Sequence, residues 1–144
     1  MRERALPILE AGGVDLVLSG HSHSYERSYL IDSHYGDSES LLEGSILDDG
    51  NGRIGGDGPY RKPPGNNPHE GAVYAVCGSS GQISQGTLDH PVMYYNLQVL
   101  GSMVMDISGS RLEAGFIDSE GVLRDFFAID KEEGPSNVQM WGLY

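Results

Sequence analysis

The 144-residue chain contains a single cysteine, Cys77, so no disulfide can form within it. It has only 9 lysine and arginine residues against 21 aspartate and glutamate residues, which gives a formal net charge of −12. Nucleic acid backbones and anionic membranes need clustered cations, so this charge disfavours both as partners. No run of about 18 apolar residues is present, and we therefore expect no transmembrane helix.

The first residues also lack the apolar segment of a signal peptide, so the sequence assigns no cellular compartment. What the chain does contain is 21 glycines and 7 prolines with 38% hydrophobic residues, which favours one loop-rich globular domain. Its acidic surface would repel phosphate groups. Any phosphate site must therefore carry local positive charge, which metal ions would supply.

A short helix followed by a strand is predicted at the start of the chain. We expect the helix over residues 3–11, with its regular part beginning near Arg4, because Pro7 is tolerated only in a first turn. Gly12–Gly13 ends it, and the apolar run within residues 14–19 predicts a buried strand. Helix then strand indicates an α/β unit. The helix side chains expected to face a sheet are Ala5, Leu6 and Leu9.

Most of the remaining chain is predicted to be β-structure. A short strand over 28–31 precedes a long loop over about 32–70, which is rich in glycine, proline and aspartate and has one helical turn near 39–44. The last three strands have short glycine-containing connections, which predicts an antiparallel meander over 102–129. We expect the tail over 132–144 to be mobile or docked on a neighbour. The strands predicted after the loop are 72–77, 94–100, 102–107, 111–117 and 122–129.

Two histidines, His21 and His23, follow the first predicted strand within the segment Gly20–Arg27. Imidazole is the commonest protein ligand of metals such as zinc and iron. Side chains at positions i and i+2 of an extended chain point to the same side, so the pair can serve one metal site. The His-x-His pattern alone is equally compatible with a polar loop.

The whole segment Val14–Arg27 resembles the last metal-binding motif of calcineurin-like metallophosphoesterases. Within them it is most similar to the purple acid phosphatase branch, in which Gly-His-x-His is followed by Tyr-Glu-Arg. The resemblance covers residues 1–131 as the C-terminal portion of the family's domain. It implies a β-rich α/β fold, namely the C-terminal part of a two-sheet αββα sandwich, with one short N-terminal helix followed by mostly antiparallel strands.

The resemblance also implies a phosphatase activity that this chain does not complete. Family members hold two metal ions, iron paired with zinc, manganese or iron, and an activated hydroxide attacks the phosphorus of a phosphate ester. His21 resembles the ligand of the divalent ion, and His23 resembles the ligand of the other, often ferric, ion. The family's earlier ligand motifs have no counterpart in the chain. We expect weak or no metal binding, no complete catalytic site, and a need for a complementing N-terminal portion.

Residues close to the histidines are weaker candidates. Tyr25, Glu26 and Arg27 either orient the metal ligands, contact substrate or serve the structure alone. His34 and Tyr35 lie in the polar loop and are either surface residues or border the site.

Two other functions remain open. The chain would be a non-enzymatic β-rich module if unpaired strand edges assembled it into a homo-oligomer. It would be a mononuclear metal-binding protein if a third donor such as His34 joined His21 and His23.

Overall fold

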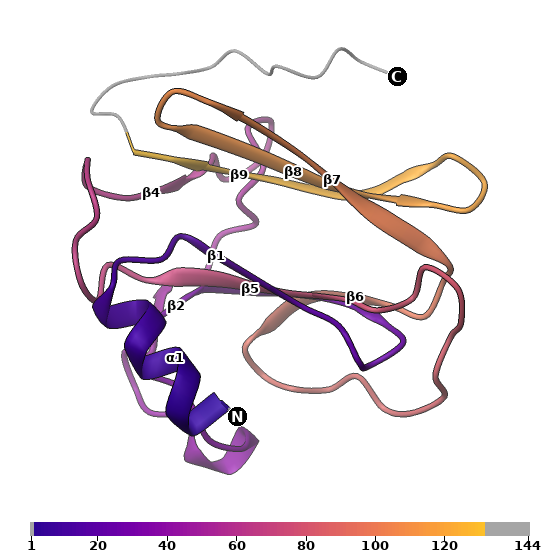
Figure 1. Cartoon of the computed structure of the whole chain (residues 1–144), viewed down its shortest axis with the longest axis horizontal. Coiled ribbons are helices and arrows are strands. Elements are labelled where there is room, and N and C mark those ends of the chain that lie inside the picture. The colour runs from indigo at the N-terminus through magenta and orange to yellow at the C-terminus, as the bar shows by residue number, and fades with distance from the viewer. Residues whose placement is uncertain (1, 132–144) are drawn as a thin grey trace.

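The computed structural model describes residues 2–131, in which two β-sheets face each other and a helix lies outside one of them (Figure 1). This arrangement confirms the predicted β-rich α/β sandwich. The predicted tail over 132–144 lies outside the described residues. Sheet A contains β1 (Leu16–Ser19), β2 (Tyr25–Ile31), β3 (Ile46–Asp48), β5 (Ala72–Cys77) and β6 (Met93–Leu97). Sheet B contains β4 (Tyr60–Arg61), β7 (Gly101–Ser108), β8 (Arg111–Asp118) and β9 (Leu123–Asp130).

Helix α1 (Arg2–Ala11) begins earlier than predicted and keeps Pro7 in its interior. Pro7 has no N–H to donate to the carbonyl group of Glu3, but that residue is exposed, so water can replace the lost bond. Gly13, with φ 73°, ends the helix in the left-handed conformation that glycine adopts without strain. Within the described residues no helix is long and apolar enough to cross a membrane.

The inward face of α1 matches the predicted apolar face only in part. Ala5 and Leu6 are half-buried, but Leu9 is 38% exposed, and Glu10 is the buried residue of the helix. The prediction missed Glu10 because this residue finds hydroxyl partners inside, described below, and a buried carboxylate with hydrogen-bond partners is tolerated.

Sheet A is organised around β5. Its neighbours are β1, which is parallel to it, and β2, which is antiparallel. On its other side β2 pairs antiparallel with β6 and then with β3. The strand β1 therefore lies at an edge, and Leu18 is 46% exposed, so the prediction of a buried strand here was wrong.

The segment after the histidines is more regular than predicted. The strand β2 begins at Tyr25, and the short strand predicted over 28–31 is its second half. The predicted loop over 32–70 contains a 3₁₀ turn at Ser38–Ser40 and the short strands β3 and β4. Strands of two or three residues are too short to show a period of two, so no sequence pattern predicted them.

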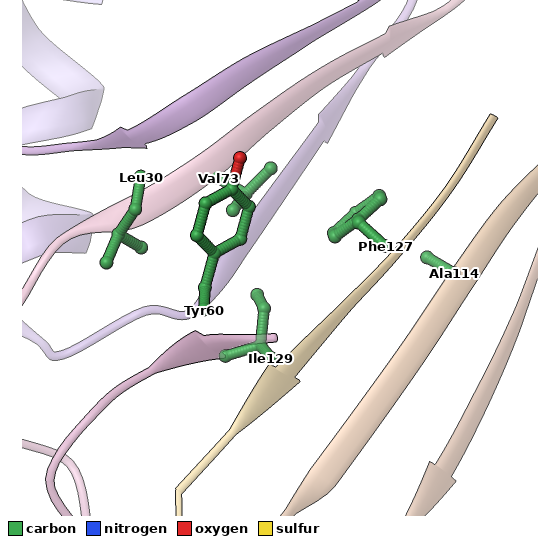
Figure 2. Close-up of a cluster of buried hydrophobic side chains, with 6 residues drawn as sticks. All are labelled: Leu30, Tyr60, Val73, Ala114, Phe127 and Ile129. Atoms are coloured by element: carbon green, nitrogen blue, oxygen red, sulfur yellow. The ribbon is translucent and has the colours of Figure 1, made fainter. Parts of the chain in front are cut away.

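Sheet B contains the predicted meander, formed by the antiparallel strands β7, β8 and β9. The short strand β4 adds to it parallel to β9. The hydrophobic core fills the space between the sheets, as Figure 2 shows for the buried cluster. Sheet A contributes Leu30 and Val73 to this cluster, and sheet B contributes Tyr60, Ala114, Phe127 and Ile129.

A buried ion pair joins the two sheets beside this core. Arg27 of β2 donates from Nε and Nη2 to the two carboxylate oxygens of Asp125 on β9, at 2.6 and 3.0 Å. Its guanidinium carbon also lies 4.6 Å from the ring centre of Tyr94 and 4.8 Å from that of Phe127. Burial would lower the pKa of Arg27, but the hydrogen bond and charge of Asp125 outweigh this and raise it.

We predict that Arg27→Met lowers the free energy of unfolding by about 3–5 kcal/mol, because it leaves a buried carboxylate without its main partner. Urea unfolding monitored by circular dichroism measures the loss. The double variant Arg27→Met/Asp125→Leu should recover part of it, since neither member of the pair then remains as an unpaired buried charge.

Arg124→Met is the matched control, because Arg124 is 40% exposed and its partner Asp118 keeps the Glu120 and Val122 amides as donors. It should cost only a small fraction of the Arg27→Met loss. Equal losses for the two single variants would show that the buried pair does not hold the sheets together.

Candidate functional site

The segment Gly20–Ser24, called the histidine loop below, lies at one end of the strands of sheet A. It connects β1 to β2, and both strands pair with β5: Ser19 is opposite Val76, and Tyr25 is opposite Cys77. The loop therefore crosses the carboxyl end of β5. Because β1 and β5 are parallel, their carboxyl ends meet here, which is the position where α/β sheets form ligand sites.

The two histidines are held in this loop by close backbone packing. His21 is exposed and adopts a left-handed conformation with φ 73°. His23 is half-buried, and its carbonyl oxygen accepts a hydrogen bond from the Ser84 amide at 2.9 Å. A Cβ atom at Gly78 would lie 2.1 Å from the Ser22 carbonyl oxygen and 3.4 Å from the His21 nitrogen. Only glycine permits this approach, so Gly78 fixes how the loop sits on the end of β5.

Glu26 is connected to the histidine loop through hydroxyl groups. Ser24 Oγ donates to Glu26 Oε1 at 2.8 Å and lies 2.9 Å from Ser22 Oγ. Glu26 thus supports the loop from the start of β2.

Tyr25 and Arg27 point to the other face of β2, into the space between the sheets. The Tyr25 hydroxyl donates to Asp125 at 2.8 Å, and its ring stacks on Phe116 with centres 4.2 Å apart. Burial, followed by the charge of Asp125, raises the pKa of the Tyr25 phenol. Burial would raise the pKa of Asp125 as well, but Arg27 and Arg53 hold it below its ordinary value. These contacts anchor the strand that follows the histidines.

His34 is buried against a second histidine, His90. Their Nε2 atoms are 3.5 Å apart, and His90 Nδ1 accepts from the Val92 amide at 3.4 Å. The neutral His90 ring therefore carries its proton on Nε2 and points it at His34 Nε2. Burial, followed by the charge of Arg2, lowers the pKa of His34. Burial also lowers the pKa of His90, with His34 and Arg2 adding to the effect.

Tyr35 lies apart from this pair and donates its hydroxyl proton to Glu10 Oε2 at 2.5 Å. Among residues 2–131, no contact joins His34 or Tyr35 to the histidine loop. Both residues lie in the segment after β2. His34 connects this segment to the residues before β6, and Tyr35 connects it to helix α1.

The donor set at the histidine loop is too small for a complete metal centre. Catalytic zinc sites use three protein ligands and structural ones use four. In the described part of the chain, His21 and His23 belong to no group of three or more ligand-type side chains within 4.8 Å of one another. His34 therefore does not complete a three-ligand group with them here.

A group that does meet this distance criterion was not predicted from the sequence. It consists of Glu10, Asp32 and His69, which come from three segments far apart in the chain. No motif links such residues, because their positions in the sequence do not reveal that helix α1 ends beside the start of β5.

Comparisons with known proteins support the fold and show no activity. No protein-family model matches the chain, and no curated protein matches it in sequence. In structure the chain is similar to the purple acid phosphatase PPD1 isolated from yellow lupin (Lupinus luteus) seeds, with a TM-score of 0.63 and 16% sequence identity. The similarity covers 87% of this chain and 19% of the lupin chain. The chain thus has a metallophosphoesterase-like fold and spans about a fifth of that phosphatase.

We predict that Gly78→Ala displaces the histidine loop, because the new methyl group would collide with the Ser22 carbonyl oxygen. The imidazole resonances of His21 and His23 should shift in two-dimensional NMR spectra, and stability should fall by about 1–3 kcal/mol. Gly81→Ala is the matched control, since no atom lies within 4 Å of its added Cβ. If the two variants give the same spectra, Gly78 does not position the loop.

We also predict that stability falls as the pH drops below about 6.5. The pKa values of His34 and His90 are lowered in the folded state, so the unfolded chain binds more protons in this range. Nearby carboxylates oppose the effect in part, Asp37 at His34 and both Glu26 and Asp89 at His90.

Urea midpoints measured between pH 7 and pH 5.5 test this prediction. The double variant His34→Gln/His90→Gln should lose less stability over the interval than the unmodified chain. Parallel pH profiles for the two proteins would show that this pair does not cause the loss.

Proposed function

We propose that this chain is part of a metal-dependent phosphoric ester hydrolase of the purple acid phosphatase type, in which it supplies His21 and His23 as metal ligands. The observation that carries the proposal is the position of the histidine loop. Within a metallophosphoesterase-like fold, both histidines lie where the parallel strands β1 and β5 end.

Residues 2–131 by themselves do not fit a two-metal centre. Two imidazoles give each of two ions at most one protein ligand from this loop, so the other ligands must come from additional polypeptide. In such a centre the metal ions would supply the positive charge that draws a phosphate group to an acidic protein of net charge −12. The complementing portion is accordingly the partner we propose, with a phosphate ester as substrate.

Arg27 lies close to the histidine loop in sequence, but its hydrogen bonds exclude it as a phosphate-binding residue. Its side chain is fully buried, and its guanidinium nitrogens already donate hydrogen bonds: Nε and Nη2 to Asp125, and Nη1 to the Tyr60 hydroxyl. A guanidinium in this position holds the fold and is not free to contact phosphate. Arg27 is therefore not among the cations available to bind the substrate.

A second candidate function is assembly through strand edges. The strand β1 ends sheet A and β7 ends sheet B, and both expose apolar side chains. Leu18, Met105 and Ile107 are 46%, 43% and 67% exposed. Unpaired edges of this kind pair with other chains, so a homo-oligomer formed through β1 or β7 is the alternative.

We predict that the isolated chain does not hydrolyse a chromogenic phosphate monoester above the uncatalysed rate, with or without added Zn²⁺, Mn²⁺ or Fe³⁺. Zn²⁺ in excess should shift the imidazole resonances of His21 and His23 only weakly, because the loop offers each ion a single protein ligand. His21→Ala should leave the shift at His23, since the two imidazoles serve different ions.

Two results would contradict the proposal. Hydrolysis at the rate of an intact phosphatase, abolished by His21→Ala, would show that the site is complete without further ligands. A Zn²⁺-induced shift at His23 that is lost with His21→Ala would show that both imidazoles hold one ion, contrary to their assignment to two ions. A dimer in sedimentation that is lost with Ile107→Lys would favour assembly through β7.

A further inference from the structure

Three ligand-type side chains converge at a place remote from the histidine loop. Glu10 lies in the last turn of α1, Asp32 follows β2, and His69 shortly precedes β5. Their donor atoms all lie within 4.8 Å of one another, the one such group found within residues 2–131. His69 Nδ1 is 3.2 and 3.3 Å from the two carboxylate oxygens of Asp32.

This cluster and the histidine loop occupy opposite ends of the same strands. His69 comes before the first residue of β5, whereas the histidine loop crosses the end of β5 beyond Cys77. A strand of six residues spans roughly 20 Å. One ion therefore cannot use ligands from both places.

Hydrogen bonds set the three segments against one another. The His69 amide donates to the Glu10 carbonyl oxygen at 3.1 Å, and the Ser33 amide, next to Asp32, donates to Glu10 Oε2 at 3.0 Å. Both the segment of Asp32 and the segment of His69 are thus fastened to Glu10. The cluster is open to solvent on one side, since the His69 side chain is 49% exposed.

The carboxylate of Glu10 is oriented by neutral donors. It is 2% exposed and accepts from the Ser33 amide at 3.0 Å and from the hydroxyls of Tyr35 and Tyr74. Partners of this kind fix the direction of a metal-binding carboxylate without neutralising its charge.

The cluster also gathers negative charge in one place. Glu10 and Asp32 bring two carboxylates beside the imidazole of His69. A divalent cation would balance the charge of two carboxylates.

We propose that Glu10, Asp32 and His69 bind one divalent transition-metal ion of the Zn²⁺ or Mn²⁺ class. Three protein ligands with water in the remaining positions form a common zinc coordination. Two donors on a tetrahedral ion lie roughly 3.3–3.5 Å apart for metal–donor distances of about 2.0–2.1 Å, close to the spacing of His69 and Asp32. One imidazole among oxygen donors favours Zn²⁺ or Mn²⁺ over Ca²⁺.

An ion at this position would clamp the end of α1 to the end of β2 and the start of β5. Ligands on three separate segments would keep those segments together, so metal binding to the folded chain would stabilise it. The site is independent of the proposed phosphatase function.

The test is a calorimetric titration of the full chain with Zn²⁺ alone at pH 7, carried out on the His21→Gln/His23→Gln background. This background removes the histidine loop as a ligand and leaves the cluster intact. We expect binding of one ion and a rise in Tm on saturation. Adding Asp32→Asn or His69→Gln should weaken Zn²⁺ binding by at least about tenfold, since even outer-shell partners are worth about 10–100-fold.

Mn²⁺ provides a second readout that does not depend on stability. As a paramagnetic ion it should broaden the NMR signals of Ser33 and His69 first and leave those of Ser22 and Ser24 sharp. Asp32 and His69 are chosen because they are partly exposed, whereas replacing buried Glu10 endangers the fold.

The proposal is overturned if the His21→Gln/His23→Gln background binds no Zn²⁺, or if Asp32→Asn and His69→Gln leave the affinity unchanged. Broadening by Mn²⁺ centred on the histidine loop would overturn it too. A Zn²⁺-induced shift at His23 that is lost with His21→Ala counts against the phosphatase proposal and leaves this one standing, so the two failures are distinguishable.

Discussion

The ion pair between Arg27 and Asp125 is the interaction on which the arrangement of the two sheets depends. It joins β2 of one sheet to β9 of the other, and neither residue is accessible to water. A buried charge is tolerated only when its partner is well aligned, so a shift of one sheet against the other would leave both charges buried and unpaired. Tyr25 adds to this constraint by donating to Asp125 and stacking on Phe116.

The position of the histidine loop depends on the contacts that Asp125 makes with Tyr25 and Arg27. Tyr25 and Arg27 are anchored between the sheets, and the loop is the stretch that immediately precedes them. Gly78 then lets the loop backbone press against the end of β5. The Tyr-Glu-Arg triplet thus contributes to the site through the strand, with Glu26 alone directed at the loop through Ser24. These contacts hold the backbone of His21 and His23 in place, yet two ligands do not make a phosphatase centre.

The two candidate metal sites differ in how visible they are in the sequence. His21 and His23 are neighbours in the chain, so a local motif reveals them. Glu10, Asp32 and His69 are brought together by the ends of α1 and β2 and the start of β5. Glu10 was also hidden by the expectation that the buried face of α1 would be apolar. Its burial depends on Tyr35 and Tyr74, which lie distant in sequence and supply hydroxyl partners.

Local sequence patterns were enough to predict strand β5, the meander of β7 to β9 and the two neighbouring histidines. Alternating apolar residues and glycine turns act over a few positions, so they can be recognised without a structure. Four other features became known from the folded chain alone: β1 is an edge strand, Arg27 faces Asp125, His34 contacts His90, and Glu10 is buried. Each of these is a contact between distant segments, and its energy depends on burial and on a partner that no local pattern identifies.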